Sequence, residues 1–238
     1  MSRNSKPRIL FVTDDCRIST GFSRVAKEII KYLLKTDKYE IFQHAWFSQN
    51  PQCEMPIKIY PTKKHPTQGF LADDVYGKHS FTDVALEVRP DLVFALGNSF
   101  MIESTVTSTL RDTYRLLHYT PIDHFHPSES WNKVLGKCDA LYLFCPWAKE
   151  VAERNIPGIT VAGVVSHGID TDIFKPLPKD ARARLKALLG IPEDAFVVGF
   201  IGRNLERKRL DQIIMTVSHL RNGTYTVRKN GSCIPFAF

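Results

Sequence analysis

The chain has 238 residues, of which 43% are hydrophobic and 24% are charged, and this balance is typical of a globular protein rather than a disordered one. Its net charge of +7 is scattered, with no basic stripe among aromatic residues, which argues against nucleic acid as a partner. No apolar run approaches the roughly 20 residues of a transmembrane segment and no secretory signal fits the N-terminus, so a cytoplasmic location is predicted.

Strands and helices are predicted to alternate from residue 8 to residue 166. Short apolar runs predict strands at residues 8–13, 39–46, 57–60, 91–97, 114–120, 140–145 and 160–165. Helices are predicted at residues 22–35, 81–89, 99–111, 129–138 and 146–155. Because the strands are apolar throughout instead of alternating, both faces of their sheet are expected to be covered, as in parallel sheets. Residues 1–166 are therefore predicted to form a doubly wound, Rossmann-like α/β domain.

A second unit is predicted after a linker at residues 167–180, which contains two prolines and several turn-forming residues. The apolar run at residues 196–201 predicts a strand outside the first sheet. Residues 181–238 are interpreted as the incomplete start of a second α/β domain with an atypical tail, because a Rossmann-like half needs on the order of 150 residues. The strand would then lack neighbours, and self-association through its apolar surface or a loosely held C-terminal segment is expected.

Two turns are candidates for binding phosphate groups. Arg203 precedes Lys208 by five residues in the turn before a predicted helix, whose free N–H groups and partial positive charge attract anions. An arginine fork and a lysine charge suit a diphosphate, with a solvated basic loop as the alternative. Gly21 opens the first predicted helix, where it either lets the backbone approach an anion or forms part of a capped turn.

Two motifs flank the predicted linker and the helix after it. The first is His-Gly-Ile-Asp at residues 167–170, followed by Phe174 and Pro176, and the second is Gly-Arg at residues 202–203, followed by Lys208. Together they resemble the retaining glycosyltransferases of family 4, which have the GT-B fold. The chain departs from the usual pattern at His167, Ile169 and Arg209, where asparagine, valine and glycine are usual. The resemblance implies two Rossmann-like domains, the first binding mainly the acceptor and the second a nucleotide-sugar donor.

The resemblance also implies roles for individual residues. Arg203 and Lys208 would hold the donor diphosphate and stabilise the leaving group, with Gly21 near the phosphates, and no metal or other cofactor would be needed. A histidine usually follows the strand at residues 114–120, close to the transferred sugar. His124, with neighbouring Asp123, is the first candidate for this catalytic position.

Other readings of these histidines remain open. His118 is a second candidate for the catalytic position, and a loop histidine with a purely structural role is a third reading. His118, His124 and His126 could instead bind a metal, which requires a further ligand that the sequence does not identify. The five cysteines include no Cys-x-x-Cys pair that would indicate structural zinc.

The predicted function is transfer of a sugar from a UDP- or GDP-linked donor, with retention, to an unknown sugar, lipid or protein acceptor. No acidic residue follows Asp211, so the Glu-x7-Glu motif that the family carries downstream is absent, and weak or no activity is expected of this chain. One alternative is a non-catalytic remnant that binds a ligand or a partner protein. Another is a phosphate-dependent binding protein or a sugar-nucleotide epimerase of similar fold.

Overall fold

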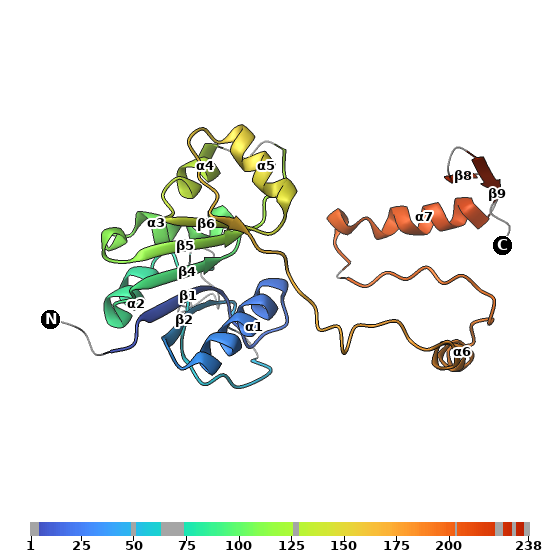
Figure 1. Cartoon of the computed structure of the whole chain (residues 1–238), viewed down its shortest axis with the longest axis horizontal. Coiled ribbons are helices and arrows are strands. Elements are labelled where there is room, and N and C mark those ends of the chain that lie inside the picture. The colour runs from blue at the N-terminus through green and yellow to red at the C-terminus, as the bar shows by residue number, and fades with distance from the viewer. Residues whose placement is uncertain are drawn as a thin grey trace, which may run out of the picture. The chain divides into compact units, whose positions relative to one another are not determined.

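A computed structural model describes residues 5–48, 51–62, 74–125, 129–202, 204–221, 226–229 and 232–235. The chain divides into two compact units, Met1–Ile169 and Asp170–Phe238. The division falls inside the segment 167–180 that the sequence marks as a linker. Figure 1 shows the sheet and helices of the first unit and the helices of the second, and each unit is described below by itself.

The first unit is built on a seven-stranded sheet with the strand order β3-β2-β1-β4-β5-β6-β7. Every neighbouring pair in this sheet is parallel. The strands are β1 (Arg8–Asp14), β2 (Glu40–Trp46), β3 (Lys58–Pro61), β4 (Leu92–Leu96), β5 (Arg115–Thr120), β6 (Ala140–Leu143) and β7 (Gly163–Val164). The prediction of a doubly wound, Rossmann-like parallel sheet is confirmed. The strand order reverses between β1 and β4, and ligands of such sheets bind beyond the carboxyl ends of the strands at this point.

Helices cover both faces of the sheet. They are α1 (Gly21–Thr36), α2 (Phe81–Val88), α3 (Glu103–Thr107), α4 (Glu129–Leu135) and α5 (Pro146–Asn155), with 3-10 turns η1 (Ser99–Ile102) and η2 (Arg111–Thr113). Leu10 and Val12 of β1 pack in one core with residues of α2, α3 and α4. Ile9 and Phe11, which point to the opposite face, pack in another core with residues of α1. The continuous apolar runs of the strands are explained by this double coverage.

The predicted helix at residues 99–111 is wrong as a single element, because the segment is broken into η1, α3 and η2. Its hydroxyl side chains bond to nearby backbone groups: Thr105 Oγ1 donates to the Ile102 carbonyl at 2.7 Å and Thr107 Oγ1 to the Glu103 carbonyl at 2.9 Å. Such bonds, together with β-branched side chains, disfavour a continuous helix. The predicted strand at residues 160–165 is reduced to the two residues of β7, which pair only with β6.

The second unit contains α6 (Lys179–Leu188), the 3-10 turn η3 (Glu206–Lys208), α7 (Leu210–Arg221) and an antiparallel hairpin of β8 (Thr226–Lys229) and β9 (Ser232–Pro235). Residues 196–201 lie outside the first sheet, as predicted, but the prediction of a strand there is wrong. A strand needs a hydrogen-bonded neighbour, and no described strand pairs with this segment. Its side chains are consequently exposed, with Phe196 at 82% and Ile201 at 102%.

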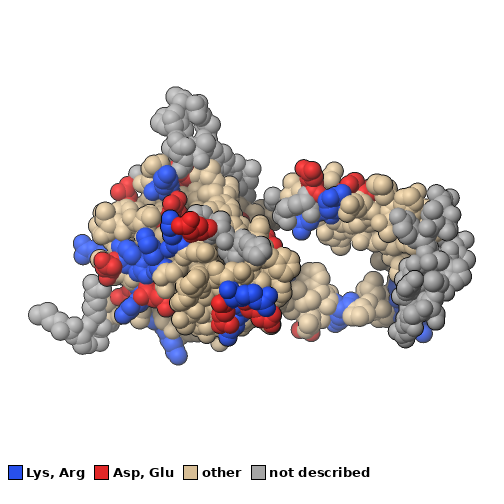
Figure 2. Space-filling view, turned by 90° about the horizontal axis from the view of Figure 1, so that it is seen from above, with Lys and Arg blue, Asp and Glu red and all other residues tan. Residues whose placement is uncertain are grey.

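None of the helices in the described ranges combines the length and the apolar character needed to cross a lipid bilayer. On the face shown in Figure 2, Lys and Arg side chains of the first unit are interspersed with Asp and Glu. Ion pairs such as Arg8–Glu40 and Lys58–Glu87 join opposite charges of the first unit. Because the two signs are mixed, this face offers no large field of one sign to steer a charged partner.

Candidate active site

The loop between β1 and α1 lies at the carboxyl edge of the sheet and is held by its own hydroxyl groups. Thr20 is the N-cap of α1, and its Oγ1 accepts a hydrogen bond from the Ser23 N–H at 3.1 Å. The same oxygen donates to Asp14 Oδ2 at 2.5 Å, and Ser23 Oγ donates to the Ile18 carbonyl at 2.5 Å. The capped turn therefore fixes the first turn of α1 before any ligand binds.

Gly21 is the first residue of α1 and is exposed, with no atom within 4 Å of the position that a Cβ would occupy. Open space thus lies beside the Gly21 Cα, whereas the Ser23 N–H is already bonded to Thr20 Oγ1. The capped turn named as one reading of Gly21 is present. The other reading, approach of an anion to this backbone, stays a prediction.

Two carboxylates in the same loop change its electrostatics. Asp15 is fully buried and its carboxylate forms a bidentate pair with Arg17, with Nη2 to Oδ2 at 2.7 Å and Nε to Oδ1 at 3.0 Å. Burial would raise the pKa of Asp15, but the hydrogen bonds and charge of Arg17 outweigh it and lower that pKa. Asp14 is 6% exposed and accepts from Thr20. Sequence reasoning missed Asp14, although an acidic pair directly after the first strand was a visible signal.

His124 and Asp123 follow β5 at the same edge of the sheet. Their side chains are 60% and 69% exposed, and His124 Nδ1 is paired with the Asp123 carboxylate. The ring of His124 also packs edge-on against Trp131 of α4, with ring centroids 5.3 Å apart. The two predicted catalytic residues therefore lie together on an accessible surface, where they could hydrogen-bond to a ligand hydroxyl.

His118 is a different kind of histidine. It is fully buried in β5, and its Nε2 lies 3.0 Å from the Gly97 carbonyl. Burial lowers its pKa to about 4, despite the hydrogen bond to Gly97, which acts in the opposite direction. Its burial does not suit the catalytic position that the sequence left open as an alternative to His124. His126 lies outside the described residues, and the described part of the chain contains no group of three or more His, Cys, Asp or Glu that could hold a metal.

The predicted diphosphate site falls on the second unit. Lys208 is the last residue of η3, is exposed, and donates its backbone N–H to the Leu205 carbonyl at 2.8 Å. Arg203 lies outside the described residues. Arg209, between η3 and α7, has φ of 51°, in the left-handed region that glycine tolerates best. The backbone shape of this turn thus gives a physical reason for the glycine that is usual at this place in family 4.

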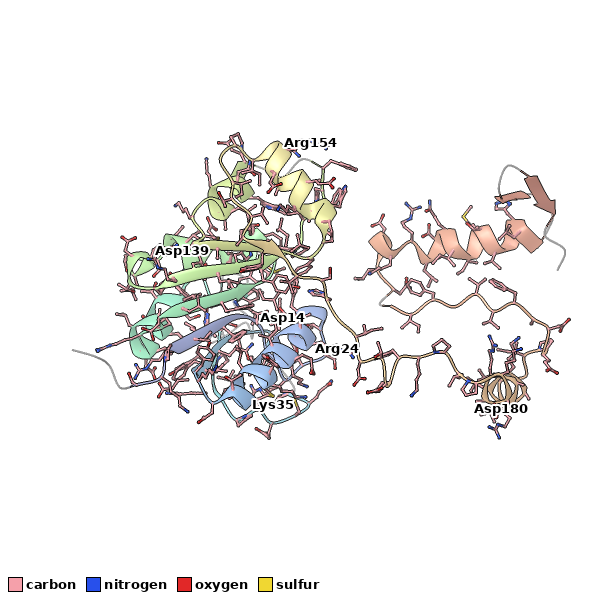
Figure 3. All side chains as sticks on the ribbon, viewed as in Figure 1. Asp14, Arg24, Lys35, Asp139, Arg154 and Asp180 are labelled. Carbon is pink, nitrogen blue, oxygen red and sulfur yellow. The ribbon has the colours of Figure 1, made fainter. Side chains whose placement is uncertain are left out.

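A cavity of about 650 Å³ opens at the opposite, amino-terminal edge of the sheet, between Arg111, Arg115 and Asp139. Figure 3 shows Asp139 and Asp14 at the two opposite edges. Both arginines pair with Asp139, at 2.7 Å and 2.9 Å. Burial would raise the pKa of Asp139, but the Leu116 N–H and the two arginines lower it to about 2. The lining as a whole carries three cations (Arg111, Arg115, Lys137) and three carboxylates (Asp91, Asp112, Asp139), so the group is better explained as a structural ion-pair network than as an anion site.

No protein-family model matches this chain, and no curated protein matches it by sequence. Among solved structures, a sucrose-phosphate synthase from Thermosynechococcus elongatus is similar over 90% of this chain, with a TM-score of 0.67 and 14% sequence identity. This chain spans 60% of the length of that synthase. The apo form of WaaB, a lipopolysaccharide outer core galactosyltransferase, gives a TM-score of 0.45 and 12% identity, with 68% of this chain and 46% of WaaB covered. The likeness to the synthase shows a shared α/β fold.

Proposed function

We propose that the protein is a glycosyltransferase that moves a sugar from a UDP- or GDP-linked donor to an acceptor with retention. The observation that carries the proposal is the position of the two family-4-like motifs on this fold. Residues 167–170 follow the last strand of the Rossmann-like sheet, and Lys208 precedes α7 of the second unit. The structural similarity to the synthase, which extends over 90% of the chain, supports the same assignment.

In this proposal the cations of the second unit hold the donor. Lys208, with Arg203, would bind the diphosphate and stabilise the negative charge that develops on it as the glycosidic bond breaks. The side chain of Lys208 is exposed. Its ammonium group is therefore free to exchange water for phosphate oxygens, and no metal ion or other cofactor is assigned to this role.

The carboxyl edge of the first unit would hold the other reactants. His124 and Asp123 are assigned to the neighbourhood of the transferred sugar, where the imidazole and carboxylate can hydrogen-bond to its hydroxyls. Gly21, the first residue of α1, is assigned to the donor phosphates, as the family resemblance implies. The cytoplasmic location remains a prediction from the sequence. The weak or absent activity of this chain also remains a prediction from the sequence.

The test is calorimetric titration of the whole chain with UDP, GDP and ADP. We expect saturable binding of one nucleotide, weakened about tenfold or more in Lys208→Ala and in Arg203→Ala, since a charge-assisted hydrogen bond is worth about 1.5–3 kcal/mol. Lys31→Ala is the matched control, because Lys31 is an exposed lysine on α1, far from either motif in the sequence.

Two results would count against the proposal. If none of the three nucleotides binds, the proposed function is refuted. If Lys208→Ala binds the nucleotide as well as Lys31→Ala does, the diphosphate site was assigned wrongly.

A further inference from the structure

Aromatic side chains line the carboxyl edge of the first unit in two neighbouring groups of ring contacts. Tyr76 meets Phe100 at 5.8 Å between ring centroids, Phe100 meets Trp131 at 6.4 Å, and Trp131 meets His124 at 5.3 Å. Phe125, next to His124 in sequence, packs edge-on against Trp147 at 5.3 Å. We call these six residues the aromatic row. They come from segments that follow β4, β5 and β6 and from the segment before α2.

The aromatic row is unusually open to solvent for such large side chains. Phe100 is 47% exposed, Phe125 is 67% exposed and Trp147 is 37% exposed. Among the described residues of the first unit, Tyr32 is the one other exposed side chain of a Phe, Tyr or Trp. Exposed aromatic residues that gather at one edge of a fold, instead of standing singly, indicate a binding surface.

Polar groups stand beside these rings. The Asp123 carboxylate is paired with His124, and both side chains are more than half exposed. Burial and, to a smaller extent, the charge of Asp14 raise the pKa of Tyr76. Asp14 itself is buried, so the exposed Asp123–His124 pair is the polar group that a ligand on the row would meet.

The charges around the row disfavour a phosphorylated or anionic ligand. Trp131 and Trp147 lie on α4 and α5. Lys133 of α4 pairs with Glu129 one turn before it, and Lys149 of α5 pairs with Glu153 one turn after it. The exposed Asp123 carboxylate beside the row would repel phosphate. An alkyl chain laid over the row would strip water from the exposed Asp123–His124 pair without replacing its hydrogen bonds, which is costly.

We propose that the aromatic row binds a neutral saccharide, which would make the acceptor of the proposed transfer a carbohydrate. The apolar C–H face of a pyranose can pack on an aromatic ring, while its hydroxyls donate hydrogen bonds to carboxylates and imidazole. The row offers both kinds of group within one surface of the first unit. That the bound saccharide is the acceptor rests on the proposed function, but saccharide binding itself can be measured without any donor.

The test uses the intrinsic fluorescence of the whole chain. Trp131 and Trp147 belong to the row, whereas Trp46 is fully buried, so a sugar on the row should change the emission. The chain is titrated with maltose, cellobiose, lactose and mannobiose, is screened on an array of neutral glycans, and is mixed in parallel with phosphatidylglycerol vesicles. We expect saturable binding of at least one neutral saccharide and none to the vesicles.

Variants locate the binding. Phe100→Ala and Phe125→Ala each remove one exposed ring. Each should lower the affinity for the saccharide about fivefold to tenfold, as the loss of one aromatic contact predicts. Tyr32→Ala is the matched control, since Tyr32 is 70% exposed on α1, and should leave binding unchanged. Melting temperatures of all variants exclude unfolding as the cause of any loss.

The inference is overturned if no neutral saccharide binds, if vesicles bind instead, or if both phenylalanine variants bind like the Tyr32 control. Failure of this inference and failure of the proposed function give different results. Nucleotide binding without saccharide binding would refute only the proposal that the acceptor is a carbohydrate. Saccharide binding without nucleotide binding would support the sugar-binding surface but refute the proposed transferase function.

Discussion

The two units use similar apolar sequence runs with opposite results. In β1 the residues Leu10, Phe11 and Val12 are fully buried. In the second unit the run at residues 196–201 is exposed, with Phe196 at 82% and Ile201 at 102%. Both runs have the composition of a strand buried on two faces. The difference shows that an apolar run becomes a strand only where neighbouring strands supply backbone partners and helices cover its side chains.

The largest effect expected of a single substitution separates the two units by stability. Phe11→Ala should lower the free energy of unfolding by about 3–5 kcal/mol, because Phe11 is fully buried and stacks on Phe94 at 4.8 Å. Phe196→Ala, the same change at an exposed position, should alter it by less than about 0.5 kcal/mol. Urea unfolding followed by circular dichroism measures both. Similar losses in the two variants would mean that residues 196–201 are packed in solution.

A second prediction uses acid to weaken the first unit. His118 is held neutral because burial lowers its pKa to about 4, and His44 of β2 is likewise buried with a pKa of about 4. In the unfolded chain both titrate near pH 6.5, so the unfolded state binds more protons below that pH. Stability should therefore be full above about pH 6.5 and fall by about 3 kcal/mol per histidine as the pH approaches 4.

The check is thermal unfolding of the wild type and of His118→Gln between pH 7.5 and 4. The variant should lose part of the acid sensitivity, and His79→Gln, at an exposed histidine, should keep it. A flat stability profile for the wild type between pH 6.5 and 4 would show that these histidines are not held neutral in the fold.

A third, smaller effect concerns the start of the first helix. Thr20→Ala removes the N-cap bond to Ser23 and the bond to Asp14, and should cost about 1 kcal/mol of stability. Ser19→Ala, next to it, removes only an exposed bond to Gln52 and should cost less. Chemical denaturation of the two variants compares them. Equal losses would contradict the assignment of Thr20 as the cap.

The smallest expected effect is weak self-association of the protein through the second unit. Leu188, Phe196 and Ile201 are 82% to 102% exposed, so we expect weak self-association. Light scattering should show a mass that rises with protein concentration, and replacement of all three by serine should abolish the rise. Tyr32→Ser serves as the control at an isolated exposed position. A monomer at every concentration would remove this prediction.

Most of the first unit could be predicted from the sequence because its local patterns agree with its packing. The strand predicted at residues 8–13 became β1 (Arg8–Asp14), and the helix predicted at residues 22–35 became α1 (Gly21–Thr36). The predictions failed where local pattern and context disagreed. The run at 99–111 contains hydroxyl residues that bond to the backbone, and the run at 196–201 has no strand beside it.

The candidate site was predictable only in part, for a physical reason. Gly21, His124 and Asp123 each follow a strand, and the carboxyl ends of parallel strands meet at one edge. The aromatic row was missed, because Tyr76, Phe100 and Trp131 become neighbours only through the order of the sheet. Their exposure, which distinguishes a binding surface from a core, is likewise a property of the folded chain.

The most direct test of the account is hydrogen–deuterium exchange of the whole chain with UDP-glucose, GDP-mannose and ADP-glucose. The donor is assigned to the turn before α7, so one of these nucleotide sugars should slow amide exchange in residues 204–215, and Lys208→Ala should remove that protection. The ion-pair network of Arg111, Arg115 and Asp139 at the opposite edge of the first unit should exchange at the same rate with and without ligand. Unchanged exchange in residues 204–215 with all three donors would contradict the proposal that this chain binds a nucleotide sugar there.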